Sequence, residues 1–203
     1  VSSGEIMHSH TPPMEEAKSL YVDQADLINH LRLPEGKSAD ELPELIIWDV
    51  GLGAATNAMA AIQCYEKVAS EGGARRMKII SFENNCDALR LALTHKSKFE
   101  YLRHSAPDAL LARKHWVSRQ YSGLSWQLHE GDFWETAPKV CEKPDIIFYD
   151  FFSHKTDTHG WHFDAFKKLY QIVESKKSTA LFTYSASTAV RASLLSAGFS
   201  VAA

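Results

Sequence analysis

Short apolar runs alternate with longer stretches of helical periodicity along most of this chain. The runs end in glycine or acidic residues, and the stretches between them repeat apolar residues every three or four positions. Apolar runs with such ends are typical of buried strands, and the stretches between them are typical of helices that pack on a sheet. The pattern therefore predicts an α/β domain with a mainly parallel sheet.

The predicted elements cover most of the sequence. Strands are expected over residues 45–50, 78–82, 124–129, 145–149 and 179–184, with the start of a sixth at 199–201. Helices are expected over residues 14–31, 55–70, 86–121, 161–174 and 187–197. Residues 34–43 have the composition of a polar linker, so we divide the chain into an N-terminal part, 1–43, and a larger domain, 44–203.

A glycine turn follows the first predicted strand. Asp49 precedes Gly51-Leu52-Gly53, and a helical stretch begins directly afterwards. Glycines let the backbone approach a ligand without a Cβ in the way, and a helix N-terminus offers free N–H groups. The order of strand, glycine turn and helix indicates a nucleotide-type cofactor site, although ordinary strand-to-helix turns share it.

Acidic residues follow three further strands in the same register. Glu83 ends the second predicted strand, Gly131-Asp132 follows the third, and Asp150 follows the fourth. Because the carboxyl ends of parallel strands line the ligand crevice of an open sheet, these groups should lie on one rim. Glu83 is farther from Gly51 than the usual ~20 residues, which the long helix between them explains.

Composition narrows the possible functions. The chain has 203 residues and a net charge of -3, which suits one domain without a global basic signature. No apolar run reaches the roughly 18 residues of a membrane span, and no signal-peptide pattern is present. Three widely spaced cysteines predict reduced thiols, so we expect a cytoplasmic protein with no membrane partner.

Residues 90–119 are the most basic region of the chain. They hold seven Lys or Arg residues against two acidic ones. Such a region forms either a phosphate-contacting face or an ordinary solvated helix surface.

The rim of glycines and acids resembles that of class I S-adenosylmethionine-dependent methyltransferases, which have a Rossmann-like three-layer sandwich. The resemblance implies that Gly51 and Gly53 lie under the methionyl part of the cofactor. It also implies that Glu83 holds the ribose hydroxyls and that Gly131-Asp132 meets the adenine amino group. Asp150 would face the transferable methyl group, and the product would be S-adenosylhomocysteine.

Further motifs narrow the resemblance over nearly the whole chain. They are Glu15-Glu16-Ala17 with Tyr21-Val22, Gly51-Leu52-Gly53 with Asn57, Asp150-Phe151-Phe152-Ser153, Trp161 and Phe166, Phe182-Thr183-Tyr184-Ser185, Val190-Arg191, and Ala197-Gly198-Phe199. In order and spacing they resemble the MnmC-like methyltransferase domain. That family makes the methylaminomethyl group on the wobble uridine of tRNA, in 5-methylaminomethyl-2-thiouridine biosynthesis, from an aminomethyl precursor.

The resemblance assigns roles to particular residues. It implies that Asp150 and Phe152 are catalytic, with Asp150 orienting the acceptor amine. The cofactor-binding set is Glu16, Tyr21, Asp49, Gly51, Gly53, Asn57, Glu83, Gly131, Asp132 and Asp150, with residues 1–43 covering that site. The substrate set is Ser153, His154 and Trp161. Phe152, Tyr149 and Trp161 would wall the site, although core packing also explains each aromatic residue. No metal is expected.

The sequence departs from the family in two places. His154 stands where the family usually has Pro, and Asp157-Thr158 stands where it usually has Asn-Pro. The sequence also ends at Ala203, before a hairpin rich in glycine and basic residues, so we expect an incomplete last strand. We expect a stand-alone form whose flavin-dependent oxidoreductase partner is a separate protein, and tRNA bound transiently through residues 90–119.

Other functions remain open at this point. The altered loop and the negative charge favour a methyltransferase of the same fold acting on another amine or small molecule. A non-catalytic cofactor- or RNA-binding module is a third hypothesis, against which the intact rim argues. A nicotinamide-dependent oxidoreductase is the weakest, because that site prefers a third small residue where this chain has Thr56.

Overall fold

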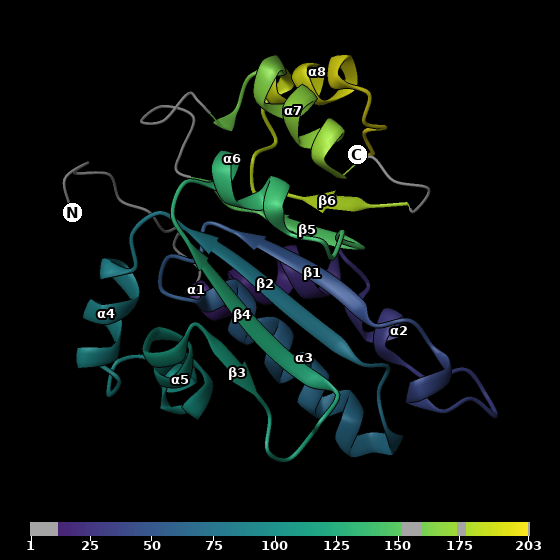
Figure 1. The fold of residues 1–203 in the computed structure, drawn as a ribbon, viewed down its shortest axis with the longest axis vertical. Helices are drawn as coiled ribbons and strands as arrows, with labels where there is room; N and C mark the ends of the chain where they lie inside the picture. Colours follow the sequence, from purple (N-terminus) through teal and green to yellow (C-terminus); the bar gives the residue numbers. More distant parts are fainter. Residues whose placement is uncertain (1–11, 152–159, 174–177, 203) are drawn as a thin grey trace.

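The structure is a computed structural model that describes residues 12–151, 160–173 and 178–202 (Figure 1). These residues form a six-stranded sheet in the order β3-β4-β2-β1-β5-β6. The strands are Leu45–Val50 (β1), Met77–Glu83 (β2), His115–Val117 (β3), Leu124–Glu130 (β4), Ile146–Tyr149 (β5) and Ala180–Phe182 (β6). Every neighbouring pair is parallel except β3 and β4. The predicted α/β class with a mainly parallel sheet is confirmed.

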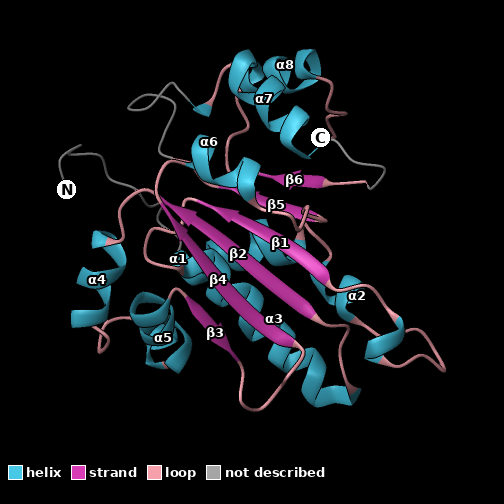
Figure 2. Ribbon diagram, viewed as in Figure 1, coloured by secondary structure: helices cyan, strands magenta, loops and turns pink. Residues whose placement is uncertain are grey.

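Helices cover both faces of the sheet (Figure 2). The α-helices are Pro13–Ala17 (α1), Leu27–Leu31 (α2), Thr56–Gly72 (α3), Asp87–Thr94 (α4), Ser105–Arg113 (α5), Phe133–Thr136 (α6), Phe163–Val173 (α7) and Thr188–Ala197 (α8). Four further helical elements accompany them: a π-helix, Lys18–Asp23 (η1), and the 3-10 turns Ala39–Glu41 (η2), Glu100–Arg103 (η3) and Ala137–Lys139 (η4). In the part of the chain that is described, no helix is long and apolar enough to cross a membrane.

Two hydrophobic cores follow from this layering. Strand β1 is buried along its whole length, and its residues point alternately to the two faces. Leu45 and Ile47 pack with η1 and α1 to α5, whereas Trp48 and Val50 pack with α6 to α8. This two-sided burial explains why β1 begins with four successive apolar residues rather than an alternating pattern.

The strand order creates a switch point beside β1. From β1 the chain continues to β2 and then β4 on one side, whereas β5 and β6 pair on the other side. At such a point the connections leave in opposite directions and open a crevice at the carboxyl ends of the strands. The glycine turn after β1 and Asp150 after β5 therefore face the same crevice.

Three predicted elements differ in the structure. The helix expected over 14–31 is broken into α1, η1 and α2, and Asp26 between η1 and α2 has a φ of 50°. The helical region 86–121 instead holds α4, η3, α5 and the short edge strand β3. Of the three residues of β3 only Trp116 is buried, so the strand carries too little periodicity to be predicted. Residues 199–201, expected to begin a strand, form none.

Candidate cofactor and active site

The glycine turn brings the ends of β1 and β5 close together. Gly51 has a φ of +89°, and a Cβ there would lie 2.2 Å from the carbonyl oxygen of Asp150. Gly53 and Ala55 also have positive φ values, of 51° and 67°. Helix α3 begins directly after Ala55, so its N-terminus opens toward the crevice. Only glycine fits at position 51, because both the backbone conformation and the neighbouring strand exclude a side chain.

Glu83 ties the glycine turn to the end of β2. Its Oε2 atom accepts a hydrogen bond from the Gly53 N–H at 3.0 Å, and its Oε1 atom accepts one from the Asn85 N–H at 2.9 Å. The residue is only 8% exposed. A carboxylate offers about four acceptor positions, so two remain for hydroxyl donors. Glu83 thus both shapes the turn and retains the capacity to bind a diol.

Asp150 follows β5 and is held by α3. The Asn57 side-chain amide, in the first turn of α3, donates to Oδ2 of Asp150 at 2.7 Å. Asn57 is buried and Asp150 is half-buried. The hydrogen bond joins the two edges of the crevice and orients the Asp150 carboxylate. The structure therefore brings together Gly51, Gly53, Asn57, Glu83 and Asp150, as the sequence predicts.

Asp49 lies beneath this rim at the centre of a buried polar line. The Ser81 hydroxyl donates to Oδ2 of Asp49 at 2.6 Å, and the Trp126 indole N–H donates to the Ser81 hydroxyl at 2.8 Å. All three residues are buried. Oδ1 of Asp49 and the hydroxyl of Tyr21 are buried without a hydrogen-bond partner among the described residues. Ser81 and Trp126 escaped the sequence analysis, although a polar residue inside an apolar strand is a signal that could have found Ser81.

Burial and neighbouring charges raise the pKa of both groups that lack a hydrogen-bond partner, the Asp49 carboxyl and the Tyr21 hydroxyl. Burial raises the pKa of Asp49 to about 7, and the Asp150 and Glu83 carboxylates add to this, whereas the Ser81 hydrogen bond opposes it. Burial also raises the pKa of Tyr21, with further contributions from the charges of Asp150 and Asp49. The backbone of Tyr184 opposes part of this rise in the pKa of Tyr21. Tyr21 is therefore a neutral phenol among carboxylates.

Asp49→Asn is expected to change the pH dependence of stability. Between the ordinary carboxyl pKa of 3.8 and about 7, the folded protein keeps a proton that the unfolded chain has lost. The raised pKa of Asp49 therefore lowers the free energy of unfolding as pH rises through this window, and the penalty is complete above pH 7. Relative to the unmodified protein, the Asn variant should be more stable at pH 8 than at pH 5. Urea unfolding at both values measures this difference, and an equal difference at both would contradict it.

Asp132 has a structural role that the sequence left unnoticed. Its Oδ1 atom accepts hydrogen bonds from the backbone N–H groups of Trp134 and Glu135, so it caps α6. The Gly131 N–H donates to the carbonyl oxygen of Glu83 at 2.9 Å, which keeps this turn beside the end of β2. Asp132 is exposed, and Oδ2 has no hydrogen bond within the described ranges. One oxygen thus remains for a ligand.

The remaining predicted residues lie in different surroundings. Glu16 is half-buried in α1. Trp161 is 5% exposed and packs against Tyr149 and Tyr184, with ring centroids 5.4 Å from each. Tyr149 is fully buried, so it belongs to the core rather than to a wall of the crevice. The predictions for Phe152, Ser153 and His154 lie outside the described residues.

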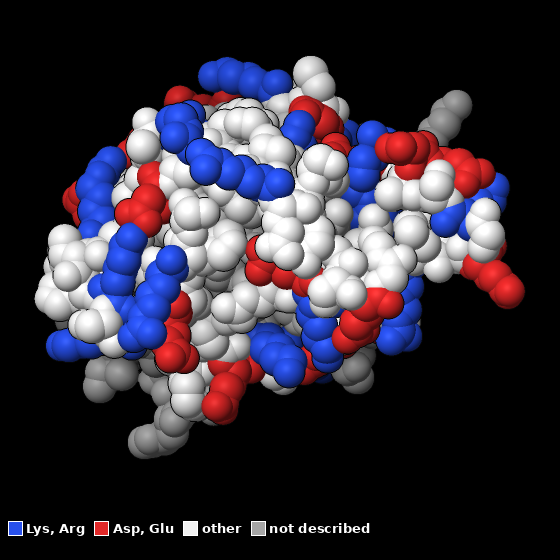
Figure 3. All heavy atoms as spheres, turned by 90° about the horizontal axis from the view of Figure 1, so that it is seen from below, with Lys and Arg blue, Asp and Glu red and all other residues white. Residues whose placement is uncertain are grey.

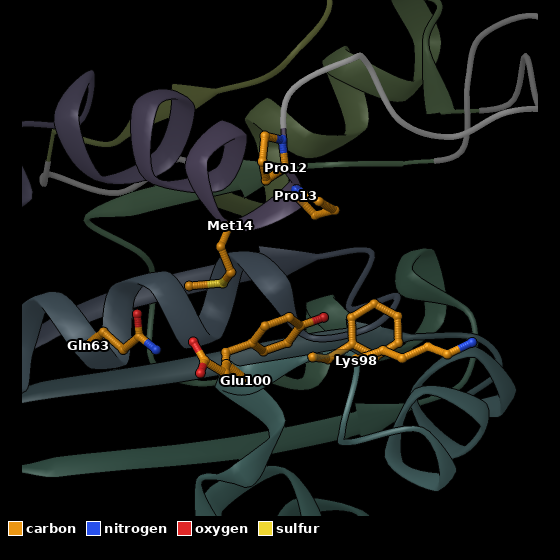
Figure 4. Close-up of a pocket in the computed structure, with 8 residues that line it drawn as sticks. Pro12, Pro13, Met14, Gln63, Lys98 and Glu100 are labelled. Atoms are coloured by element: carbon orange, nitrogen blue, oxygen red, sulfur yellow. The ribbon is translucent and has the colours of Figure 1, made fainter.

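A cavity of about 330 Å³ lies beside the rim rather than in it. It is bounded by the start of α1, by Gln63 of α3 and by residues 98–101, and Met14 points into it (Figure 4). The Tyr101 hydroxyl, on its wall, donates to the Ala54 carbonyl at 3.2 Å. None of the carboxylates of Asp49, Glu83 and Asp150 lines it, so this cavity is separate from the rim.

Metal-ligating side chains do not gather in the structure as described. Among residues 12–151, 160–173 and 178–202, no three His, Cys, Asp or Glu side chains are arranged as ligands of one ion.

Comparison with known proteins identifies the family to which the chain belongs. A family model described as S-adenosyl-L-methionine-dependent methyltransferase matches residues 95–203, more than half of the chain. The chain belongs to this family. The methyltransferase is therefore an enzyme, and S-adenosylmethionine is its cofactor. No protein with a curated function matches its sequence.

Solved structures of methyltransferases are similar to this one. The crystal structure of MnmC2 from Aquifex aeolicus has 24% sequence identity and a TM-score of 0.65, over 95% of this chain and 57% of that one. The methyltransferase thus spans little more than half of that structure's length. Precorrin-6y C5,15-methyltransferase from Geobacter metallireducens has 15% identity and a TM-score of 0.43, over 86% of this chain and 66% of that one. The first of these supports the fold, in line with the MnmC-like resemblance.

The residues present fit the cofactor. S-adenosylmethionine carries a positive sulfonium and a positive α-ammonium group. On the protein, the Asp150 and Glu83 carboxylates lie near enough to Asp49 for their charges to raise its pKa. The buried, unpartnered Oδ1 of Asp49 and hydroxyl of Tyr21 are acceptors that ammonium N–H donors would satisfy. Negative charge and buried acceptors without a partner are the features that a cationic ligand requires.

Proposed function

We propose that this methyltransferase transfers a methyl group to the amine of an aminomethyl group on a tRNA wobble uridine. The observation that carries the proposal is the Asp150 carboxylate, held by Asn57 at the switch point beside the glycine turn. The motifs from Asp150 to Phe199 and the likeness in fold to MnmC2 from Aquifex aeolicus support the tRNA acceptor. A tRNA substrate and free Cys64, Cys86 and Cys141 are in keeping with a cytoplasmic location.

Bound S-adenosylmethionine supplies a methyl group that is already activated by its positive sulfur. In the transfer a nitrogen–carbon bond forms as the carbon–sulfur bond breaks, so the protein has to align the amine and exclude water. In this proposal Asp150 accepts a hydrogen bond from the neutral amine and orients its lone pair. An ionised carboxylate also favours the protonated, unreactive amine. The hydrogen bond from Asn57 draws part of the negative charge away from the amine and so limits this tendency.

The cofactor contacts are part of the same proposal. Glu83 would accept hydrogen bonds from the ribose hydroxyls through the acceptor positions that the backbone leaves free. Asp132 would meet the adenine through its Oδ2 atom. Asp49 and Tyr21 would accept from the α-ammonium group. Glu16 would contribute from α1, and Trp161 would support the acceptor side from within the core.

Glu83→Ala is expected to weaken S-adenosylhomocysteine binding at least tenfold. The change removes an acceptor of ligand hydroxyls and also frees the Gly53 and Asn85 N–H groups. Hydrogen bonds to a charged group contribute roughly 1.5–3 kcal/mol each, and about 1.4 kcal/mol is a tenfold change in affinity. Calorimetric titration measures the dissociation constant. Glu142→Ala, which removes an acid that pairs with Lys78 away from the rim, is the control, and equal affinity of both variants would refute the ribose role.

The surface that would bind tRNA carries less unpaired positive charge than the sequence of residues 90–119 suggests. Four of the seven basic residues between 90 and 119 pair with acids, in Arg90–Asp87, Arg90–Glu130, Lys96–Asp108, Arg103–Glu100 and Lys114–Glu130. Figure 3 shows Lys and Arg atoms adjoining Asp and Glu atoms over one face of the molecule. Lys98, Arg113 and Arg119 form no ion pair with any described residue, so we assign phosphate contact to these three.

The test is transfer of labelled methyl from S-adenosylmethionine to tRNA from cells that lack the modification. Nucleoside mass spectrometry should find the label in methylaminomethyl-uridine. A separate flavin-dependent oxidoreductase would supply the aminomethyl precursor, so its presence in the reaction should not be needed once that precursor is present. Absence of label on tRNA, with cofactor binding intact, would refute the tRNA acceptor.

A smaller amine is the second candidate acceptor. His154 and Asp157-Thr158 replace the usual family residues in the segment after Asp150, and the net charge is -3. The same assay with a panel of primary and secondary amines separates the candidates. Methylation of one amine without any tRNA product would favour this second function.

A further inference from the structure

A buried polar line crosses three neighbouring strands under the cofactor rim. It consists of Trp126 on β4, Ser81 on β2 and Asp49 on β1, and Asp49 and Ser81 are direct partners in the strand register. Each residue is at most 1% exposed. Polar groups so deep in a sheet lower stability unless each hydrogen bond is made, so their presence needs a reason.

The direction of the hydrogen bonds is determined by chemistry. An indole N–H can only donate, so the Ser81 hydroxyl accepts from Trp126. Ser81 has a single proton of its own, which must then point to Oδ2 of Asp49. A carboxylate accepts that proton better than a carboxylic acid does, so the line favours the ionised form of Asp49. The other oxygen, Oδ1, is left without a partner among the described residues.

We propose that Ser81 and Trp126 are positioning residues that keep Asp49 ionised and hold its free oxygen toward the α-ammonium end of S-adenosylmethionine. This inference rests on the proposed cofactor contact of Asp49 and not on the identity of the methyl acceptor. In this proposal Ser81 and Trp126 act on the cofactor only through Asp49 and do not contact it themselves.

The groups that face Asp49 oppose its ionisation. Asp150 and Glu83 raise its pKa by repulsion, burial raises it further, and Tyr21 contributes a neutral hydroxyl from η1. The Ser81 hydrogen bond is the one contribution that lowers the pKa of Asp49. The resulting value of about 7 means that the free protein carries a proton on Asp49 at mildly acidic pH. An ammonium ion beside Asp49 requires the carboxylate, so ligand binding must release that proton.

The first test uses the unmodified protein. Calorimetric titration with S-adenosylhomocysteine, between pH 5.5 and 8 in buffers of different ionisation enthalpy, gives affinity and proton release together. Below pH 7 the affinity should fall towards tenfold for each pH unit, with release approaching one proton. Binding that is independent of pH and releases no proton would overturn the proposal.

Variants then separate positioning from mere packing. In Ser81→Ala the midpoint of the pH dependence of binding should rise by about one pH unit. The reason is that the free energy of one hydrogen bond to a charged group corresponds to a pKa shift of about one unit. Binding at pH 7 should weaken about fivefold and recover at higher pH. Trp126→Phe should shift the midpoint in the same direction by less. Asp49→Asn should remove the pH dependence.

Ser118→Ala is the matched control. Ser118 is also buried and accepts one hydrogen bond, from the Tyr121 N–H, but it lies away from the rim. Its pH profile should equal that of the unmodified protein. If Ser81→Ala weakened binding equally at every pH, the role of Ser81 would be structural and the proposal wrong. If Ser81→Ala did not fold, the proton release and the Trp126→Phe profile would decide. These outcomes do not depend on methyl transfer to tRNA. If tRNA were not methylated, only the proposed acceptor would be refuted, and the role of Ser81 and Trp126 would still be tested by binding.

Discussion

Gly51→Ala is expected to abolish cofactor binding and to lower the melting temperature by about 6–12 °C. The new Cβ would lie 2.2 Å from the Asp150 carbonyl oxygen and 2.9 Å from its carbonyl carbon. Both atoms belong to the backbone next to β5, so no side-chain rotation can relieve the overlap. The positive φ of 89° adds a conformational penalty. Together overpacking and strain cost about 3 kcal/mol, and any relief must move β1 and β5 apart at the crevice.

Substitutions at two other glycines separate the steric overlap from the conformational penalty of a positive φ. Gly36 has a φ of +75°, but no atom lies within 4 Å of the place that a Cβ would take, so Gly36→Ala measures the conformational penalty alone, away from the rim. Gly53 also has open space around it and a φ of +51°, so Gly53→Ala should fold well and reveal any contact with ligand. Thermal unfolding and calorimetric titration of the three variants provide the comparison. If Gly51→Ala were no less stable than Gly36→Ala, the close approach of the strands would be disproved.

Asp150→Ala is expected to lower the rate of methyl transfer on the order of a hundredfold. The change removes the carboxylate that would orient the amine, whereas Glu83, Gly53 and the start of α3 stay in place. Affinity for S-adenosylhomocysteine should therefore change much less than turnover. Asp150→Asn should show how much of the loss is due to charge, because the amide has nearly the same size.

Single-turnover kinetics and calorimetry on the same preparations make this measurement. Asp87→Ala is the control, because Asp87 is exposed and pairs with Arg90 on the outside of α4. The control should keep its rate and its affinity. Unchanged turnover in Asp150→Ala would refute the catalytic assignment, and a parallel loss of rate and affinity would make Asp150 a cofactor ligand instead.

The amino-acid sequence by itself determined the class of fold and which residues end its strands. Apolar runs that end in Gly51, Glu83 and Asp150 are local signals, because a buried strand, a tight turn and a helix start each depend on neighbouring residues. The structure confirms the parallel sheet and places these residues on one edge. Elements with weak local signals were mispredicted, namely the edge strand His115–Val117, the break at Asp26 and the strand expected at 199–201.

The tertiary structure alone decided how the rim residues act on one another. Asn57 and Asp150 are 93 positions apart in the sequence, and Ser81 and Trp126 are 45 apart, so no periodicity reveals their hydrogen bonds. The seven basic residues of 90–119 are clear in the sequence, but the partners that neutralise four of them include acids beyond that region. Local sequence sets which strands and turns form, whereas charge, burial and hydrogen bonding depend on which strands become neighbours. That is why Asp49 is visible in the sequence as one more acidic residue, and only the folded sheet surrounds it with the groups that determine its charge.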